Sequence, residues 1–485
     1  MKQTFNLIAT VAAGLEAVVG REVRALGYDC QVENGRVRFE GDVKAIIETN
    51  LWLRAADRIK IVVGTFPAKT FEELFQGVFA LDWENYLPLG ARFPISKAKC
   101  VKSKLHNEPS VQAISKKAVV KKLQKHYARP EGVPLMENGP EFKIEVSILK
   151  DVATIMIDTS GSSLFKRGYR TEKGGAPIKE NMAAAILQLS NWYPDKPLID
   201  PTCGSGTFCI EAAMIARNMA PGLRRSFAFE DWNWVSDRLI QEVRTEASKK
   251  INREIELDIM GCDIDGRMVE IAKANAQAAG VSKDIYFKQM RVQDLRTDKI
   301  NGVIISNPPY GERIKVEDMQ QLYTMIGERL KHNYAGCSAW ILAFKPEHFN
   351  HIGLRQSHRE KLMNGALECE LRGYELFEGR RDSFAERKSR RAEGEQGVGR
   401  RIDRRDVSVG REKRSNSMDR ENKPPYRSPR PDKPFRTSDK RKKEHDDEQQ
   451  RETRWPNDRF RSSDESERGP RKSSSKRIQV IRNDE

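Results

Sequence analysis

The chain has 485 residues, enough for about two to four domains, and a formal net charge of +16. No stretch approaches the roughly 20 apolar residues that a membrane-spanning helix needs. The seven cysteines contain no CxxC pair, which argues against a disulfide framework and against a zinc site. We therefore expect a cytoplasmic protein that holds no metal and whose partner is a nucleic acid or another anionic surface.

The first 167 residues predict an α+β fold without a phosphate-binding loop. Short strands are expected at 5–8, 37–39, 60–63, 142–149 and 152–157, and helices at 15–26, 70–79 and 111–127.

A basic stretch lies in this half, between Lys97 and Arg129. It holds ten Lys or Arg residues against one acid, Glu108. The helix expected at 111–127 places four apolar side chains toward a core and its lysines outward; the apolar positions are Val111, Ile114, Ala118 and Leu123. Solvated lysines are common on helices, but so uneven a balance favours contact with an RNA backbone.

From about residue 168, strands and helices alternate along the chain. Strands are expected at 197–200, 257–261, 285–287, 303–305 and 339–344, and helices at 181–192, 207–218, 268–279 and 319–330. A hairpin is expected at 362–377, because Asn364-Gly365 favours a two-residue turn. This alternation predicts an α/β domain with a doubly wound, mostly parallel sheet that ends in an antiparallel pair.

The segment DPTCGSGTF joins the end of a buried strand to the start of a helix. Its glycines let a ligand approach the backbone, and the helix N-terminus offers unpaired N–H groups. It is not the dinucleotide motif, because Cys209 stands in place of the third glycine. An acid before the glycines suits a ligand with both a cationic amine and a carboxylate, as in S-adenosyl-L-methionine. The cofactor-binding residues predicted here are Asp200, Thr202, Gly204, Gly206 and Thr207.

Two further segments extend the predicted cofactor site. In GCDID, at the end of the second strand, Asp263 can accept from both ribose hydroxyls and Ile264 can lie on the adenine face. Asp265 is expected to cap the next helix. In VQDL, Asp294 is placed to accept from the exocyclic amine of adenine.

The fourth strand ends in SNPPYGER. The Asn307 side-chain oxygen and the Pro308 carbonyl can both accept from one planar NH2 group, and the prolines hold that carbonyl rigid. Tyr310 offers a ring for a flipped-out base, a contact worth roughly 1–3 kcal/mol. We expect these three residues to orient an amine for attack on the methyl group of the cofactor. The alternative is a strand stop without chemistry.

These motifs resemble those of class I amino-group methyltransferases. Longer segments are similar to the THUMP-domain RNA methyltransferases of the RlmL type, which make N2-methylguanosine in bacterial 23S rRNA: LFKRGYR, APIKENMAAAIL, RNMAPGL and NGALECEL. The resemblance covers about residues 1–378. It implies a ferredoxin-like segment at 1–65, a THUMP RNA-binding domain at 66–167, and a Rossmann-like S-adenosylmethionine-dependent methyltransferase domain with a mostly parallel seven-stranded sheet at 168–378.

Residues 379–485 predict a disordered basic tail. They hold 33 Lys and Arg against 22 Asp and Glu, and therefore +11 of the net charge. The tail is expected either to bind RNA electrostatically or to act only as a solubilising appendage.

The resemblance implies a methyltransferase acting on guanine N2, with 23S rRNA or a pre-50S particle as substrate. Three alternatives stay open, because a pocket for an amine does not identify the base. They are a tRNA guanine-N2 methyltransferase, an N6-adenine DNA methyltransferase, and a non-enzymatic RNA-binding or ribosome-assembly factor.

Overall fold

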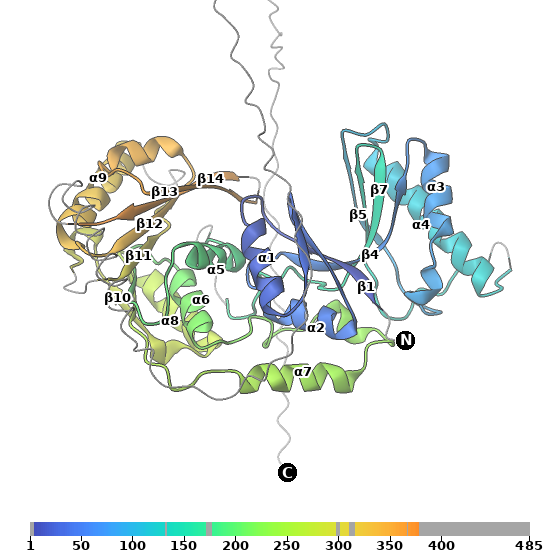
Figure 1. The fold of residues 1–485 in the computed structure, drawn as a ribbon, viewed down its shortest axis with the longest axis horizontal. Helices are drawn as coiled ribbons and strands as arrows, with labels where there is room; N and C mark the ends of the chain where they lie inside the picture. The colour runs from blue at the N-terminus through green and yellow to red at the C-terminus, as the bar shows by residue number, and fades with distance from the viewer. Residues whose placement is uncertain are drawn as a thin grey trace, which may run out of the picture. The chain divides into compact units, whose positions relative to one another are not determined.

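The computed structural model describes residues 4–130, 133–170, 177–296, 301–309, 316–365 and 367–377. In this part of the chain the strands form two sheets of seven strands each, ordered β2-β3-β1-β4-β7-β6-β5 and β10-β9-β8-β11-β12-β14-β13 (Figure 1). All of these residues belong to one unit, Met1–Ile402. The predicted tail, residues 379–485, lies outside the described residues.

The first sheet is mixed and runs without a break through the predicted boundary at residues 65 and 66. Strand β4 pairs antiparallel with both β1 and β7, so one strand joins the two predicted segments. A bulge follows Val62, and a Cβ added at Gly64 would lie 2.3 Å from the Leu81 Cδ2 atom, so a larger residue there would require the Leu81 side chain to move. The strands are β1 (Phe5–Thr10), β2 (Cys30–Glu33), β3 (Arg36–Gly41), β4 (Arg58–Pro67), β5 (Ile95–Val101), β6 (Ile144–Leu149) and β7 (Val152–Asp158).

Four helices connect strands of this sheet: α1 (Glu16–Ala25), α2 (Val43–Trp52), α3 (Phe71–Ala80) and α4 (Glu108–His126). Three of them begin at a capping side chain that accepts a backbone N–H, as the residue types predict. The caps are Asp42, Thr70 and Asn107. Because Asn107 caps α4, that helix starts three residues before its predicted start.

The prediction that the lysines of α4 point outward was wrong for two of them. The Lys116 ammonium lies 3.5 Å from the centroid of the Phe93 ring and 2.5 Å from the Glu137 Oε1 atom. The Lys122 ammonium lies 3.8 Å from the Glu84 Oε1 atom. Both acids come from outside the basic stretch, so counting charges within it could not reveal these pairs. The exposed cations of the stretch are Lys97, Lys99, Lys102, Lys104, Lys117, Lys121, Lys125 and Arg129.

The second sheet confirms the predicted fold class. Its strands β8 (Leu198–Asp200), β9 (Ile259–Asp263), β10 (Ile285–Gln289), β11 (Val303–Ser306) and β12 (Ser338–Ala343) pair in parallel. Strands β13 (His358–Asn364) and β14 (Leu367–Glu375) form the predicted hairpin, and β14 lies antiparallel to β12.

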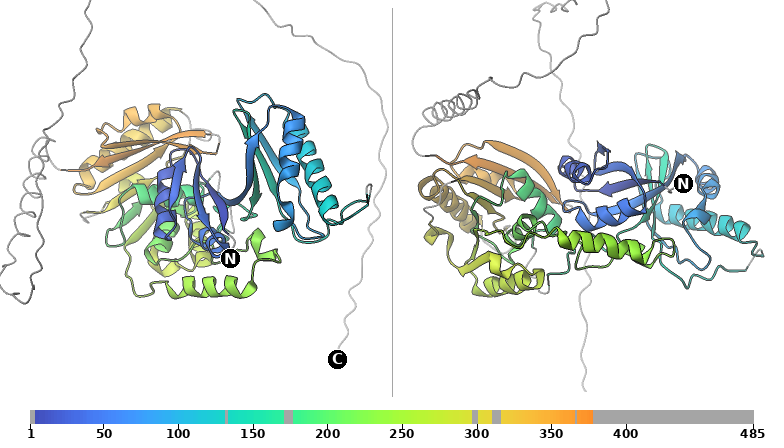
Figure 2. Two further views of the ribbon diagram at one scale, coloured as in Figure 1. Left: turned by 45° about the vertical axis from the view of Figure 1, so that its right-hand side comes forward. Right: turned by 60° about the horizontal axis from the view of Figure 1, so that its bottom comes forward.

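Helices cover both faces of the second sheet. Figure 1 shows α5 (Glu180–Leu189), α6 (Thr207–Ala216) and α8 (Gly266–Ala279) on one side and α9 (Val316–Asn333) on the other. Successive residues of β11 face opposite ways, so Val303 and Ile305 join the core that includes α6 while Ile304 joins the core under α9. Helix α7 (Asp237–Lys249) instead packs against α2 of the first half (Figure 2).

None of the helices in the described ranges combines the length and the apolar character that crossing a bilayer would require.

Candidate active site

Three of the predicted segments meet at the carboxyl edge of the second sheet. Asp200 ends β8, Asp263 ends β9 and Ser306 ends β11. Because β8 pairs in parallel with both β9 and β11, these three strand ends are neighbours. Ligands of open α/β sheets bind beyond this edge.

The glycine loop after β8 has the backbone shape that its glycines allow. Gly204 and Gly206 have φ angles of +52° and +80°, which side chains disfavour. A Cβ at Gly206 would lie 2.9 Å from the Phe287 Cζ atom. A Cβ at Gly204 would meet only the Met268 Cε atom, at 3.9 Å. The Gly204 side of the loop is therefore open to a ligand, whereas Gly206 packs inward.

Asp200 is a buried carboxylate that pairs with no cation among the described residues. Its side chain is 1% exposed, and its Oδ1 atom accepts from the Thr202 N–H at 3.1 Å. Burial raises the pKa of Asp200 well above its ordinary value, and the nearby Asp263 charge raises it further. A cationic ligand amine would supply the missing partner.

Asp263 ties the loops after β8 and β9 together. Its Oδ2 atom accepts from the Gly204 N–H and its Oδ1 atom from the Asp265 N–H, both at 2.9 Å. Each oxygen keeps a second lone pair, so acceptance from ribose hydroxyls is still available. Asp265 caps α8 by accepting from the Arg267 N–H, which confirms its predicted role. Ile264, 64% exposed, presents an apolar side chain at this edge.

Asp294 is exposed at the end of a short 3-10 turn, Val292–Asp294, after β10. The Met290 N–H donates to the Asp263 carbonyl at 2.9 Å, so this segment is held beside the end of β9.

One hydrogen bond joins the glycine loop to the segment after β11. The Thr202 and Ser306 hydroxyl oxygens lie 2.8 Å apart. Asn307 follows Ser306 and is half-buried, and Pro308 is buried. Tyr310 lies outside the described residues. The loop predicted to bind the cofactor and two of the residues predicted to hold the amine are therefore adjacent.

Sequence reasoning missed Arg170, which contacts the same loop. Its Nη2 atom donates to the Thr207 Oγ1 atom at 3.0 Å, and its Nε atom pairs with the Glu180 Oε1 atom at 3.1 Å. Its two partners lie 10 and 37 positions away along the chain, so no helix or strand periodicity connects them to Arg170.

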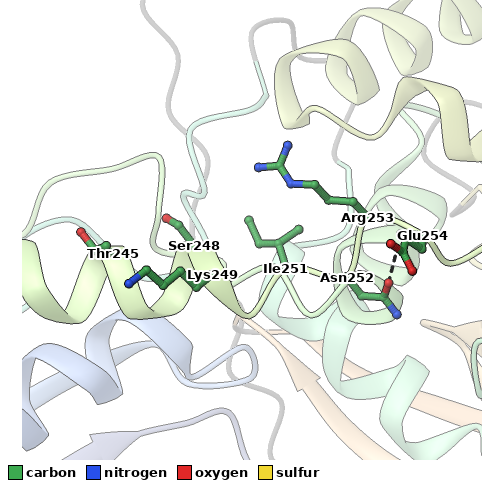
Figure 3. A pocket seen from close by; sticks show the side chains of 7 residues that line it. All are labelled: Thr245, Ser248, Lys249, Ile251, Asn252, Arg253 and Glu254. Carbon is green, nitrogen blue, oxygen red and sulfur yellow. Dashed lines mark hydrogen bonds between the residues drawn. The ribbon is translucent and has the colours of Figure 1, made fainter.

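A hollow of about 590 Å³ lies elsewhere, at the C-terminal end of α7 (Figure 3). Its position is fixed by Asn252, whose N–H donates to the carbonyl of Arg217. Arg217 is the residue after the C-terminal end of α6, so the hollow lies at the opposite end of that helix from Thr207. No residue predicted for the active site lines this hollow; the lining residues are Thr245, Ser248, Lys249, Ile251, Asn252, Arg253 and Glu254.

Comparison with known protein families agrees with this arrangement. A family described as "RMKL-like, methyltransferase domain" matches residues 167–373. An "RlmL ferredoxin-like domain" matches residues 6–60, and a THUMP domain matches residues 68–158. The two sheets thus correspond to a THUMP-containing module and a methyltransferase domain.

Individual relatives extend over most of the described chain. "Putative RNA methyltransferase YpsC" of Bacillus subtilis (strain 168) is 46% identical over 371 residues, which are 76% of this chain and 96% of the relative. The chain therefore belongs to the family of THUMP-containing, RlmL-like methyltransferases.

Two solved structures are also similar. The crystal structure of SMU.472, described as "a putative methyltransferase complexed with SAH", is 61% identical, has a TM-score of 0.74, and covers 78% of this chain and 100% of its own. A "predicted N6-adenine-specific DNA methylase" from Listeria monocytogenes is 48% identical, has a TM-score of 0.72, and covers 77% of this chain and 96% of its own. SAH, S-adenosylhomocysteine, is what S-adenosylmethionine becomes on losing its methyl group, so SMU.472 supports the predicted cofactor.

Proposed function

We propose that the chain is an S-adenosylmethionine-dependent RNA methyltransferase that modifies the exocyclic N2 of a guanine, with 23S rRNA or a pre-50S particle as substrate. The observation that carries this proposal is the 2.8 Å contact between the Thr202 and Ser306 hydroxyls. It holds a loop suited to the methyl donor against a segment suited to an amine.

The residues at the edge of the second sheet fit this cofactor. The buried Asp200 carboxylate, which pairs with no cation in the described part of the chain, suits the amine of the methionine part. The open side of Gly204 admits a ligand to the backbone, and the exposed Ile264 offers an apolar face for adenine. Asp263 and Asp294 remain the proposed acceptors for the ribose hydroxyls and the adenine amine.

When bound, S-adenosylmethionine supplies an electrophilic methyl group on its sulfonium. The chain then has to present a nucleophile, and an exocyclic amine is a weak one because its lone pair is delocalised into the ring. The Asn307 side-chain oxygen and the Pro308 carbonyl would accept from the two N–H groups and favour a tetrahedral nitrogen with a localised lone pair. Tyr310 would stack on the flipped base.

RNA rather than DNA is supported by the first sheet. The THUMP match covers residues 68–158, which include all of the exposed cations between Lys97 and Arg129. The relative YpsC is also described as an RNA methyltransferase. Exposed cations along one segment suit a phosphate backbone.

A second candidate is N6-adenine methylation of DNA. The Listeria relative is described as an adenine-specific DNA methylase, and the Asn307-Pro308 pair would hold an adenine amine as well as a guanine amine.

The test offers the purified protein and labelled S-adenosylmethionine three substrates from a strain lacking its gene: pre-50S particles with their 23S rRNA, tRNA, and DNA. Nucleoside analysis should find labelled N2-methylguanosine in 23S rRNA. Label in tRNA guanine or in DNA adenine would overturn the proposed substrate in favour of the corresponding alternative. No label in any pool would overturn the enzymatic assignment.

Asn307→Ala should retain SAH affinity and lose methyl transfer by about 100-fold or more. Asn252→Ala is the matched control, because Asn252 lines the hollow of Figure 3 and should leave transfer unchanged. Unaltered turnover in Asn307→Ala would contradict the proposed mechanism.

A further inference from the structure

Arg170 lies where the chain enters the methyltransferase domain, and its side chain is only 11% exposed. Besides the contacts to Glu180 and Thr207 already described, its Nη2 atom donates to the Ile178 carbonyl at 3.1 Å. These three acceptors fix the planar guanidinium, because its donors have a rigid fork geometry.

The contact between Arg170 and Thr207 determines what the Thr207 hydroxyl can do. An arginine only donates, so Thr207 Oγ1 must be the acceptor, and its own proton is left for another partner. The Ser205 hydroxyl is 3.4 Å away, too long for a strong bond. Thr207 is also the first residue of α6, so its hydroxyl stands beside N–H groups that favour an anion.

The backbone around Arg170 is anchored to the same helix. The Tyr169 hydroxyl donates to the Glu211 Oε1 atom at 3.1 Å, and Glu211 lies one turn beyond Thr207 on α6. Arg167 also pairs with Glu211, at 3.4 Å, and its Nη2 atom donates to the Arg54 carbonyl at 2.5 Å. Arg54 belongs to the first half of the chain, so contacts from that half help to hold the segment that carries Arg170.

We infer that Arg170 is a positioning residue of the cofactor site, which turns the Thr207 hydroxyl proton toward the carboxylate of the cofactor's methionine part. The inference rests on the proposed function, because it presumes that this cofactor binds here. If Arg170 only braced the fold, its loss would weaken every ligand of the site alike.

Two ligands separate these roles in calorimetric titrations. SAH carries the carboxylate, whereas methylthioadenosine keeps the nucleoside and the sulfur but lacks the amino-acid part. We expect Arg170→Met and Thr207→Val each to lower SAH affinity by about 10- to 100-fold and to leave methylthioadenosine affinity unchanged. Because Arg170 acts through Thr207, combining the two substitutions should lower SAH affinity no further than the more damaging of the two does alone.

The matched control is Arg217→Met, at the other end of α6. Arg217 pairs with Asp284, and the two side chains are 17% and 7% exposed, against 11% and 6% for Arg170 and Glu180. This variant should lose thermal stability to a similar degree and keep its SAH affinity. Thr207→Ser, which restores a hydroxyl, should recover most of the affinity lost in Thr207→Val.

Several results would overturn the inference: equal weakening of SAH and methylthioadenosine by Arg170→Met, unchanged SAH affinity, or additive losses in the double variant. If Arg170→Met does not fold, Thr207→Val decides the matter alone, because it leaves the Arg170–Glu180 ion pair intact. A wild-type protein that binds neither ligand would instead contradict the proposed function.

Discussion

Two aspartates, at the ends of β7 and β8, are buried to almost the same degree but differ in their charged neighbours. Asp158 ends β7 in the first sheet and is 2% exposed, and Asp200 ends β8 in the second and is 1% exposed. The Asp158 Oδ2 atom lies 2.5 Å from the Arg58 Nη1 atom, and its Oδ1 atom accepts from the Ser160 N–H. Asp200 has one backbone donor and, among the described residues, no cation.

Burial raises the pKa of both carboxyl groups, but the neighbouring charges act in opposite directions. Arg58 lowers the pKa of Asp158, whereas Asp263 raises that of Asp200 further. A buried charge without a partner is costly. The first carboxylate has its cation within the fold, and we propose that a bound ligand would supply the cation for the second.

The substitution Asp200→Asn is expected to have the largest effect. It should lower SAH affinity by about 2–5 kcal/mol, because it removes one partner of a buried charge pair in the complex. The free energy of unfolding of the ligand-free protein should stay the same or rise, because a buried carboxyl group that is costly to ionise is replaced by a neutral amide. Calorimetric titration and urea unfolding measure the two quantities.

Asp158→Asn is the matched control and should behave in the opposite way. It leaves Arg58 without its carboxylate and should lower the free energy of unfolding by about 3 kcal/mol, while SAH affinity is retained. The comparison fails if both variants lose the same property.

The raised pKa of Asp200 gives a pH dependence of definite sign. The folded, ligand-free protein keeps this proton at pH values where the unfolded chain has lost it. The associated stability is present at low pH and is lost as the pH rises through the raised pKa, by at most about 1.4 kcal/mol per pH unit. SAH affinity should rise over the same range, because the ligand amine pairs with the ionised carboxylate.

Asp200→Asn should remove both dependences. Other acids with raised pKa values, the buried Asp158 and Glu180 and the half-buried Glu22, are present in both proteins and cancel in the difference. Identical pH profiles for the wild type and the variant would show that Asp200 does not titrate in this way.

The sequence predicted the second sheet well because its signals are local. The apolar run before SNPPYGER gave a strand at 303–305, and the structure has β11 at Val303–Ser306. Asp265 was predicted as a helix cap and is one. The strand-end residues Asp200, Asp263 and Asn307 could be placed at one edge because parallel topology brings such ends together.

Other elements escaped prediction because their signals were weak or non-local. Helix α7 buries only Ile240, Val243 and Ala247, a thin stripe in a polar segment. Strand β5 has a single buried residue, Ala98, between lysines that suggested only a basic stretch. The partner of Lys116 depends on the path of the chain between α4 and β6, which charge counting does not contain.

The same contrast between paired and unpaired charge occurs within α4 and gives the smallest expected effect. The Lys116 ammonium contacts the Phe93 ring and pairs with Glu137. Its neighbour Lys117 is exposed and forms no ion pair with any described residue.

Lys117→Gln should make the slope of log RNA affinity against log salt concentration shallower by about 1, because one phosphate contact is lost. Lys116→Gln should keep the slope and lower the free energy of unfolding. Filter binding of 23S rRNA across a salt series measures the slope, and an equal change in both variants would mean that pairing within the fold does not decide which lysines meet the RNA.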